Sequence, residues 1–469
     1  MTSCIFCTNR AAQEVIEQLF RQDVRYVRLY FPDPLGRVKG QNVSRDQIWK
    51  ILQRGQGFDG SSIEGFVRIQ ESDKIALPMP ETFRILPYPV DGQRVGVMFC
   101  RVLDTDRAPF AGDSFLPLER ALVQMREMGY ETFFVGPELE FFLFKQGSLE
   151  KGVPQLVHSG GYFDEGVTHP GAVCRMKIVE AFHSLGIKVE GDHGEVADSQ
   201  NEIDLEYQDA WTMAWWTLLY RVVAREIAES LGMRASFMPK PITGVNGSGM
   251  HMHLSLFRKG HNAFFDADDP YSLSTVARQF MAGIFKYLPE GMLIFNQWVN
   301  SFNRLVPGYE APVYLCWGRR NRSALIRVPE YQRGQENATR IELRNPDPGC
   351  NTPLAIATVL QMGLRGITEQ LDCLPAAVEE DVFQLTDDER KARGIKALPG
   401  SFTEALNAFE TSEFMKSILG EHMHTRIVAS KRDELNTYQG AIKDDVSSNE
   451  VSDQAVVLPG AVRLYSKWL

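Results

Sequence analysis

Apolar residues follow two different spacings along this chain. A spacing of three to four residues, typical of one helix face, predicts helices over residues 11–20, 45–52, 117–128, 172–185, 209–231, 272–287, 353–371 and 402–417. Alternating or continuous apolar positions predict strands over 25–31, two pieces within 83–103, and 131–145, 250–257, 323–328 and 339–345. The most apolar helix has Asp209 as its N-cap and Gly232 just past its end.

The order of these elements predicts two domains. Residues 104–115 are polar and contain Pro and Gly, which is typical of a domain boundary. We therefore expect a small β-rich domain over 1–105 and a large α+β domain over 106–469. The polar segment Asp444–Asp453 is expected to be mobile.

Composition narrows the class of protein. Hydrophobic residues make up 44% and charged residues 23%, as in globular proteins, and the net charge of −10 argues against a nucleic-acid binder. No apolar run approaches the ~20 residues of a membrane span, and the N-terminus lacks a secretory signal pattern. The odd count of seven cysteines indicates free thiols in the cytoplasm. Cys4 and Cys7 form a lone CxxC, whose role stays open.

Three predicted strands carry polar residues two positions apart, so each pair shares one face of its strand. The pairs are Glu138 and Glu140, His251 and His253, and Glu342 and Arg344. Any single pair is better explained by an exposed or salt-bridged strand face. All three lie among apolar neighbours, where a charge is costly unless it is paired or bound to a metal. Together they favour a metal-lined cleft.

Two further carboxylates, Glu195 and Glu202, lie in HGEVADSQNEIDL, which alone would be interpreted as a polar loop. Carboxylates with an occasional imidazole suit hard divalent ions such as Mg²⁺ or Mn²⁺.

Five arginines lie within 41 residues of one another: Arg304, Arg322, Arg327, Arg340 and Arg344. Arginine binds phosphate and carboxylate in a bidentate manner, and divalent metals beside arginines suit phosphoryl transfer. Surface salt bridging is the alternative, although NRSALIRVP has few acidic neighbours. Neither a P-loop nor a strand–GxGxxG–helix unit is present, so ATP would be held in another way.

Seven motifs now resemble the class I glutamine synthetase family, in the family's order: FDGSSIEGF, GPELEFFLF, GEVADSQNEI, NGSGMHMHLS, NRLVPGYEAP, NRSALIRVP and RIELRNPDP. The resemblance covers about residues 20–440. It implies a small β-grasp-like domain before a catalytic α+β domain with a curved antiparallel sheet, an open half-barrel. It also implies ATP-dependent ligation of ammonia to the γ-carboxylate of glutamate through γ-glutamyl phosphate.

The resemblance also assigns roles to residues of this chain. One metal would be bound by Glu140, Glu195 and Glu202, and another by Glu138, His251 and Glu342. Substrate glutamate would contact Asn246, Gly247, Arg304 and Arg344. ATP would lie along Glu190, His253, Ser255, Arg322 and Arg327, with Arg322 stabilising the transferring phosphoryl group. Mg²⁺ or Mn²⁺, two or more per site, would be the cofactors.

Ammonium would bind at Asp59, with Ser62 nearby, and Glu310 would close the site and help to remove a proton. The intact FDGSSI motif favours ammonium over larger amines, because a carboxylate suits a small cation. Two alternatives remain open: a γ-glutamyl ligase for an organic amine, and a catalytically silent structural or regulatory relative. Two departures from the family pattern support the organic-amine alternative. Gly194 stands in place of the usual His, and Trp298 is expected close to the loop that binds the substrate.

Further features concern branch and assembly. The short spacing between Glu195 and Glu202 resembles the family's non-adenylylated branch, and Phe383 stands where the other branch carries its adenylylated Tyr. Arg68 matches a residue that the short branch uses in feedback inhibition. The resemblance implies a dodecamer of two stacked hexamers with active sites between subunits, where Asp59 serves its neighbour. The chain after about Ser447 departs from the family's usual ending.

Overall fold

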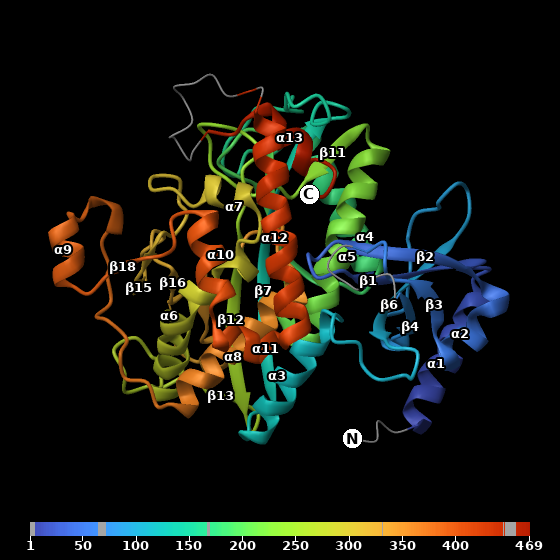
Figure 1. Cartoon of the computed structure of the whole chain (residues 1–469), viewed down its shortest axis with the longest axis horizontal. Coiled ribbons are helices and arrows are strands. Elements are labelled where there is room, and N and C mark those ends of the chain that lie inside the picture. Colours follow the sequence, from blue (N-terminus) through green and yellow to red (C-terminus); the bar gives the residue numbers. More distant parts are fainter. Residues whose placement is uncertain (1–4, 64–71, 167–168, 331, 444, 446–455) are drawn as a thin grey trace.

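The structure is a computed structural model that describes residues 5–63, 72–166, 169–330, 332–443, 445 and 456–469, with the side chains of 5–9 left aside. Two sheets with flanking helices form two lobes, and the N-terminal lobe lies to one side of the catalytic lobe (Figure 1). Arg68, Cys4 and all of the segment 444–453 except Asp445 lie outside the described residues.

The N-terminal lobe is a six-stranded sheet in the order β2-β1-β6-β4-β3, with β5 paired to β6. Its elements are α1 (Ile5–Arg21), β1 (Tyr26–Pro32), β2 (Val38–Ser44), α2 (Ile48–Arg54), β3 (Gln56–Asp59), β4 (Asp73–Pro78), β5 (Arg84–Ile85) and β6 (Val95–Leu103). The central pair β1 and β6 is parallel, and the other pairs are antiparallel. Alternate residues of β1, such as Val27 and Leu29, pack against Ile48 and Ile51 of α2 in one core.

The catalytic lobe is built on a ten-stranded sheet in the order β15-β16-β17-β12-β7-β9-β8, with β10 and β11 on β7 and β13 on β12. Its strands are β7 (Thr132–Lys145), β8 (Val189–Gly194), β9 (Gln200–Leu205), β10 (Gln208–Asp209), β11 (Met233–Ser236), β12 (Met250–Arg258), β13 (His261–Asn262), β15 (Trp317–Gly318), β16 (Ile326–Arg327) and β17 (Ile341–Leu343). A separate pair joins β14 (Tyr314–Leu315) to β18 (Lys396–Ala397). The architecture confirms the predicted α+β fold with a β-grasp domain and a half-barrel sheet.

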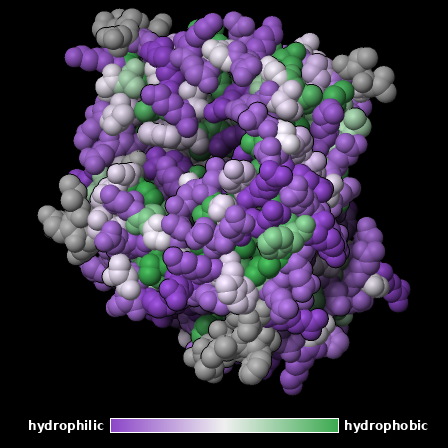
Figure 2. All heavy atoms as spheres, turned by 90° about the vertical axis from the view of Figure 1, so that its right-hand side faces the viewer, coloured by the Kyte–Doolittle hydropathy of each residue, from purple (hydrophilic) through white to green (hydrophobic). Residues whose placement is uncertain are grey.

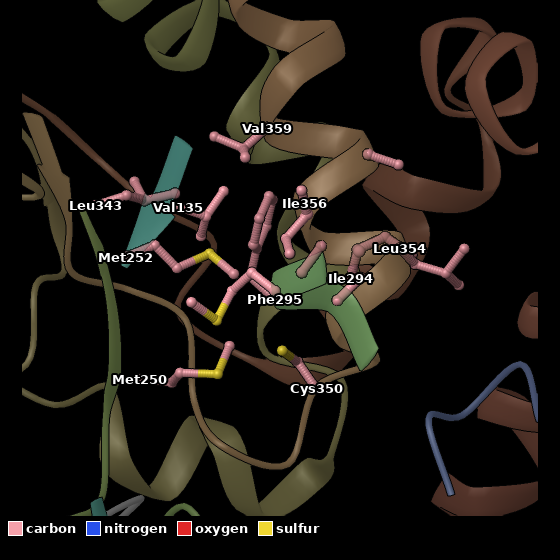
Figure 3. Close-up of a cluster of buried hydrophobic side chains, with 14 of the residues drawn as sticks. Val135, Met250, Met252, Ile294, Phe295, Leu343, Cys350, Leu354, Ile356 and Val359 are labelled. Carbon is pink, nitrogen blue, oxygen red and sulfur yellow. The ribbon is translucent and has the colours of Figure 1, made fainter. Parts of the chain in front are cut away.

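The catalytic lobe also contains helices, and some of them cover one face of its sheet (Figure 1). The helices are α3 (Phe115–Glu127), α4 (Pro170–Ser184), α5 (Ala210–Ser230), α6 (Thr275–Phe295), α7 (Val299–Arg304), α8 (Thr352–Thr368), α9 (Asp387–Ala392), α10 (Phe402–Glu410), α11 (Glu413–Leu419), α12 (Glu421–Ile442) and α13 (Pro459–Tyr465). Met250 and Met252 of β12 and Leu343 of β17 lie in one core with Phe295 of α6 and Ile356 of α8 (Figure 3). Burial of this apolar face turns the alternate residues of the strands to the opposite face.

Several predicted elements differ from the structure. The first of the two strand pieces expected within 83–103, ILPYPV at 85–90, does not form a strand beyond Ile85, because Pro87 and Pro89 have no N–H to donate. The expected helix 402–417 is two helices, since Ser412 caps α11 by accepting a hydrogen bond from Met415 N at 3.0 Å. The elements that were not predicted are strands β2, β3, β4, β8, β9, β10, β11, β13, β14, β15 and β18 and helices α7, α9, α12 and α13.

In the described part of the chain, no helix is long and apolar enough to cross a membrane. Five described cysteines are free thiols: Cys100, Cys174, Cys316, Cys350 and Cys373.

Candidate active site

The three pairs of polar residues meet on the sheet face opposite the core. Within β12, His251 and His253 alternate with the core residues Met250 and Met252. Backbone register places His251 beside Glu138 of β7 and His253 beside Glu342 of β17. The three central strands therefore align their polar positions in one stripe, which is what alternation along neighbouring strands produces.

Glu138, His251 and Glu342 form a compact group that could hold a metal ion. One ligand atom from each lies within 4.8 Å of the others. His251 Nδ1 is 3.0 Å from Glu138 Oε2 and 3.8 Å from Glu342 Oε1. Burial, together with Arg344, lowers the pKa of His251 to about 4, so this imidazole is neutral at neutral pH. A neutral imidazole beside two carboxylates is a suitable ligand set for a divalent cation.

His253 has a defined tautomer. Arg340 Nε donates to His253 Nδ1 at 3.1 Å, which requires a lone pair on that nitrogen. The proton of a neutral ring is therefore on Nε2, 2.6 Å from Glu138 Oε1. Burial opposes ionisation of Glu138, but the hydrogen bonds from His251 and His253 more than offset it and hold the pKa below its ordinary value. Glu138 is therefore an anion at neutral pH.

Glu342 is completely buried and is held by two arginines. Arg327 Nε donates to its Oε2 and Arg344 Nη1 to its Oε1. Burial alone would raise the pKa of Glu342, but Arg344 and the two histidines bring it below its ordinary value. This carboxylate therefore joins the group that could hold a metal ion to the arginines of the site.

A second group lies across the sheet, on β8, on β9 and in the segment that joins them. His193, Glu195 and Glu202 also have ligand atoms within 4.8 Å of one another. Glu140 is the register partner of Glu202, and its Oε2 accepts a hydrogen bond from Gln200 Nε2 at 2.8 Å. The resemblance implies that Glu140 binds this metal together with Glu195 and Glu202. In the structure, His193 completes the compact group with these two glutamates, and Glu140 lies beside it.

The second group carries excess negative charge. Burial and the neighbouring Glu195 raise the pKa of Glu140 to about 8, although Arg304 opposes the shift. Burial and Glu140 raise the pKa of Glu202 well above its ordinary value. Carboxyl groups that cannot all ionise together are relieved by a bound cation. The residues of this group therefore fit a divalent metal ion.

Arg304 is buried at the end of α7, near Glu140 and the loop 246–249. Its Nη1 donates to Asn345 O at 2.8 Å and Pro346 O at 3.2 Å, so the guanidinium is fixed. A Cβ at Gly249 would lie 2.6 Å from Arg304 Nη2 and 3.1 Å from Glu140 Oε1, so this position has no room for a side chain. The NGSG sequence thus allows the loop 246–249 to approach the arginine and the carboxylate closely.

Other predicted residues surround this centre. Ser255 follows His253 on the same face of β12, and Glu190 is exposed on β8. Arg322 interacts with the Tyr162 hydroxyl group and, through its charge, with Glu310. Glu310 is exposed and has φ of +55° in its turn.

Asp59 and Ser62 are not part of this cluster. Both are exposed, and Asp59 ends β3 in the N-terminal lobe, away from β7 and β12 (Figure 1). Asp59 Oδ1 accepts a hydrogen bond from Ser61 N at 2.8 Å, and the bonds from Ser61 hold its pKa below the ordinary value. The carboxylate is therefore an anion on an open surface.

Sequence reasoning missed three residues of the site: His193, Gln200 and Tyr162. Gln200 Nε2 joins Glu140 Oε2 to Gly247 O, which is 3.1 Å away. His193 precedes Gly194 in HGEV, so the motif itself contained the signal. Nothing in the local sequence around Tyr162 indicates its contact with Arg322, because the two residues are brought together only by the fold.

Trp298 is not part of this cluster of polar residues. It is buried, donates from Nε1 to Gly349 O at 2.9 Å and stacks on Trp468, with 5.6 Å between ring centroids. Trp298 therefore belongs to a cluster with residues 465–469, and the support it lent to an organic amine substrate is lost.

Two groups of residues that could each hold a cation, beside a row of arginines, are the arrangement that phosphoryl transfer needs. Residues 116–449 match the catalytic domain of glutamine synthetase and residues 23–105 its β-grasp domain. The chain is 42% identical to a glutamine synthetase of Mycolicibacterium smegmatis, with 92% of this chain and 97% of that protein covered. It is 43% identical to a glutamine synthetase of Clostridium saccharobutylicum, over 92% of this chain and 96% of that protein.

Solved structures are similar as well. A GmaS–ADP complex has a TM-score of 0.82 at 25% identity and covers 92% of this chain and 97% of that chain. A Plasmodium falciparum glutamine synthetase has a TM-score of 0.80 at 22% identity, over 93% of this chain and 97% of that chain, which is a likeness of fold. The chain belongs to the glutamine synthetase family. Its activity is the ATP-dependent synthesis of glutamine from glutamate and ammonia.

Proposed function

We propose that the reaction takes place between the two groups that could hold cations, in two steps. The γ-carboxylate of glutamate first attacks the γ-phosphorus of ATP, which gives γ-glutamyl phosphate and ADP. Ammonia then attacks the acyl carbon and phosphate leaves. The observation that carries this proposal is the convergence of two carboxylate–imidazole groups with Arg304, Arg322 and Arg344 on one face of the sheet.

Divalent cations, Mg²⁺ or Mn²⁺, would be held by Glu138, His251 and Glu342 and by His193, Glu195 and Glu202, with Glu140 beside the second group. Cations bound there would neutralise charge on the transferring phosphoryl group. The raised pKa values of Glu140 and Glu202 support this assignment, because they reflect negative charge that the protein alone does not compensate.

Arg304 and Arg344 would bind the carboxylates of glutamate, and Asn246 and Gly247 its backbone atoms. The close approach of the Gly249 backbone to Arg304 supports this assignment. Glu190, His253, Ser255 and Arg327 would lie along ATP, and the related GmaS–ADP complex supports nucleotide binding in this fold. Arg322, exposed at the cleft and oriented by Tyr162, would stabilise the moving phosphoryl group.

Asp59 and Ser62 would bind ammonium for a neighbouring subunit. Their separation from the cleft of their own chain supports this role (Figure 1). Glu310 would accept the proton that ammonium loses before it attacks. Arg322 is close enough to Glu310 to interact with its charge, which supports placing the carboxylate at the reacting centre.

An oligomer of two stacked hexamers would supply these shared sites. The face that carries the N-terminal lobe is mostly hydrophilic with small apolar patches between (Figure 2). Phe20, Tyr26 and Trp49 of this lobe are exposed apolar side chains that a subunit contact would cover. Free thiols at the five described cysteines support a cytoplasmic location.

The test is phosphate release by the purified protein with ATP, Mg²⁺ and glutamate, with ammonium compared against mono-, di- and aromatic amines. Glutamine formed with ammonium alone is the expected result, and turnover only with an organic amine would overturn it. Two variants test the assigned roles. Asp59→Ala and Glu310→Ala should each reduce ammonium-dependent turnover, and normal turnover in either would remove that residue from the mechanism.

A further inference from the structure

Lys240 is a completely buried lysine next to the loop 246–249. In the described residues, no carboxylate forms an ion pair with its ammonium group. A buried charge without a counterion is costly, and burial together with Arg304 accordingly lowers the pKa of Lys240 to about 8. Below that pH the group is still mainly an ammonium ion. The fold therefore keeps a cation in a place that disfavours it.

The contacts of Lys240 join three segments of the active site. Its backbone N donates to Asn300 Oδ1 at 2.9 Å, and its O accepts from Asn300 Nδ2 at 2.7 Å, which ties it to α7. Its Nζ donates to Val245 O, directly before Asn246 and Gly247. The same Nζ lies over the ring of Tyr309, 3.9 Å from the ring centroid. This last contact has the geometry of a cation–π interaction.

Tyr309 belongs to the turn that carries Glu310. Pro307, Gly308 and Glu310 are exposed, whereas Tyr309 is half-buried against Lys240. Gly308 and Glu310 both have positive φ, +92° and +55°, a conformation that a non-glycine residue such as Glu310 adopts only at some cost. The Lys240–Tyr309 contact is thus an anchor for an otherwise exposed turn.

We propose that Lys240 is a positioning residue that holds the Tyr309–Glu310 turn in place through the contact of its ammonium group with the Tyr309 ring. This inference rests on the role proposed above for Glu310. When the turn is released, Glu310 is no longer in position to take the proton of ammonium. Water then attacks the acyl carbon of γ-glutamyl phosphate, which returns glutamate and phosphate, so ATP is hydrolysed without glutamine being formed.

The test measures glutamine formed and phosphate released in the same reaction. Lys240→Met keeps the length of the side chain but removes its charge, and Tyr309→Leu removes the ring. Both variants should lower the ratio of glutamine to phosphate and raise the KM for ammonium by about thirty-fold at most. This upper limit corresponds to the loss of a desolvated cation–π contact of ~2 kcal/mol, at about 1.4 kcal/mol per factor of ten. The KM for ATP should change less than about two-fold, since the turn does not hold the nucleotide.

Tyr309→Phe is the matched control. It keeps the ring that the ammonium group contacts and should keep the wild-type ratio. The double variant Lys240→Met with Tyr309→Leu should be no worse than either single variant, because both changes remove the same contact. If Lys240→Met does not fold, the proposal is tested by comparing the glutamine-to-phosphate ratio of Tyr309→Leu with that of Tyr309→Phe.

Three results would overturn the inference: a wild-type ratio and ammonium KM in Lys240→Met, the same in Tyr309→Leu, or equal defects in Tyr309→Leu and Tyr309→Phe. Glu310→Ala separates this inference from the function on which it rests. Normal turnover in Glu310→Ala would refute the role of Glu310 itself. A defect in Glu310→Ala with normal coupling in Lys240→Met would refute the anchor alone.

Discussion

Glu342→Gln removes the charge that joins the candidate metal site, Glu138, His251 and Glu342, to the arginines. The side chain of Glu342 is 0% exposed, and its two oxygens are hydrogen-bonded by Arg327 and Arg344. Removing one partner from a buried ion pair costs about 3–5 kcal/mol, because the other charge is left buried without compensation. We therefore expect the metal-free variant to lose about this much free energy of unfolding.

Glu369→Gln is the matched control. This glutamate also contacts two cations, Lys286 at 2.7 Å and Arg365 at 2.9 Å, but its side chain is 28% exposed. Pairs in contact with water contribute about 0–1 kcal/mol. Urea unfolding of both variants and the wild type, treated with chelator at one fixed protein concentration, gives the comparison. Equal losses in the two variants would refute the reasoning from burial.

The same prediction has a pH dependence with a definite sign. The folded state holds the pKa of Glu342 below its ordinary value, so its stabilisation is present above the ordinary carboxyl pKa of about 4.3. It is lost as the pH falls through the lower folded value. The difference between wild type and Glu342→Gln should therefore be full at pH 7 and shrink in acid.

Three other outcomes are expected. Because the pKa of Glu140 is about 8 and that of Glu202 is also raised, Mn²⁺ binding at pH 7 should release protons. For the same reason, the metal-free protein should lose stability as the pH rises from about 4.5 through 8. An indicator dye that detects no proton release on Mn²⁺ binding would contradict this. Leu343→Ala should cost about 2.7–5 kcal/mol in urea unfolding, since this side chain is fully buried in the core of Figure 3; a loss under 1 kcal/mol would show that the core is not tightly packed there. Arg322→Gln should lower kcat by about a hundred-fold with little change in the KM for glutamate. Steady-state kinetics that show a raised KM and an unchanged kcat would instead assign Arg322 to substrate binding.

The central strands of the site could be predicted from sequence because two patterns agree in them. On β12 the core residues Met250 and Met252 alternate with His251 and His253, so the apolar pattern also fixed the face of the histidines. The same alternation on β7 placed Glu138 and Glu140. In these strands the same alternation of residues therefore predicts both the buried face and the face that carries the polar site residues.

Strands β8 and β9 were missed for the opposite reason. Residues such as Asp192 and His193 on β8 and Asn201 on β9 are polar at positions that a predicted strand would fill with apolar side chains. Their polarity serves the site, so local sequence resembles a loop while pairing with β7 makes it a strand. The contact between Tyr162 and Arg322 depends wholly on tertiary packing and has no local signal.

The measurement that tests the central claim most directly follows oxygen from substrate to product. Glutamate labelled with ¹⁸O in its γ-carboxylate is incubated with ATP, Mg²⁺ and ammonium, and the phosphate is analysed by mass spectrometry. If the carboxylate attacks ATP before ammonia displaces phosphate, each glutamine formed leaves one ¹⁸O in the phosphate released. Unlabelled phosphate accompanying glutamine would contradict the two-step account of this site.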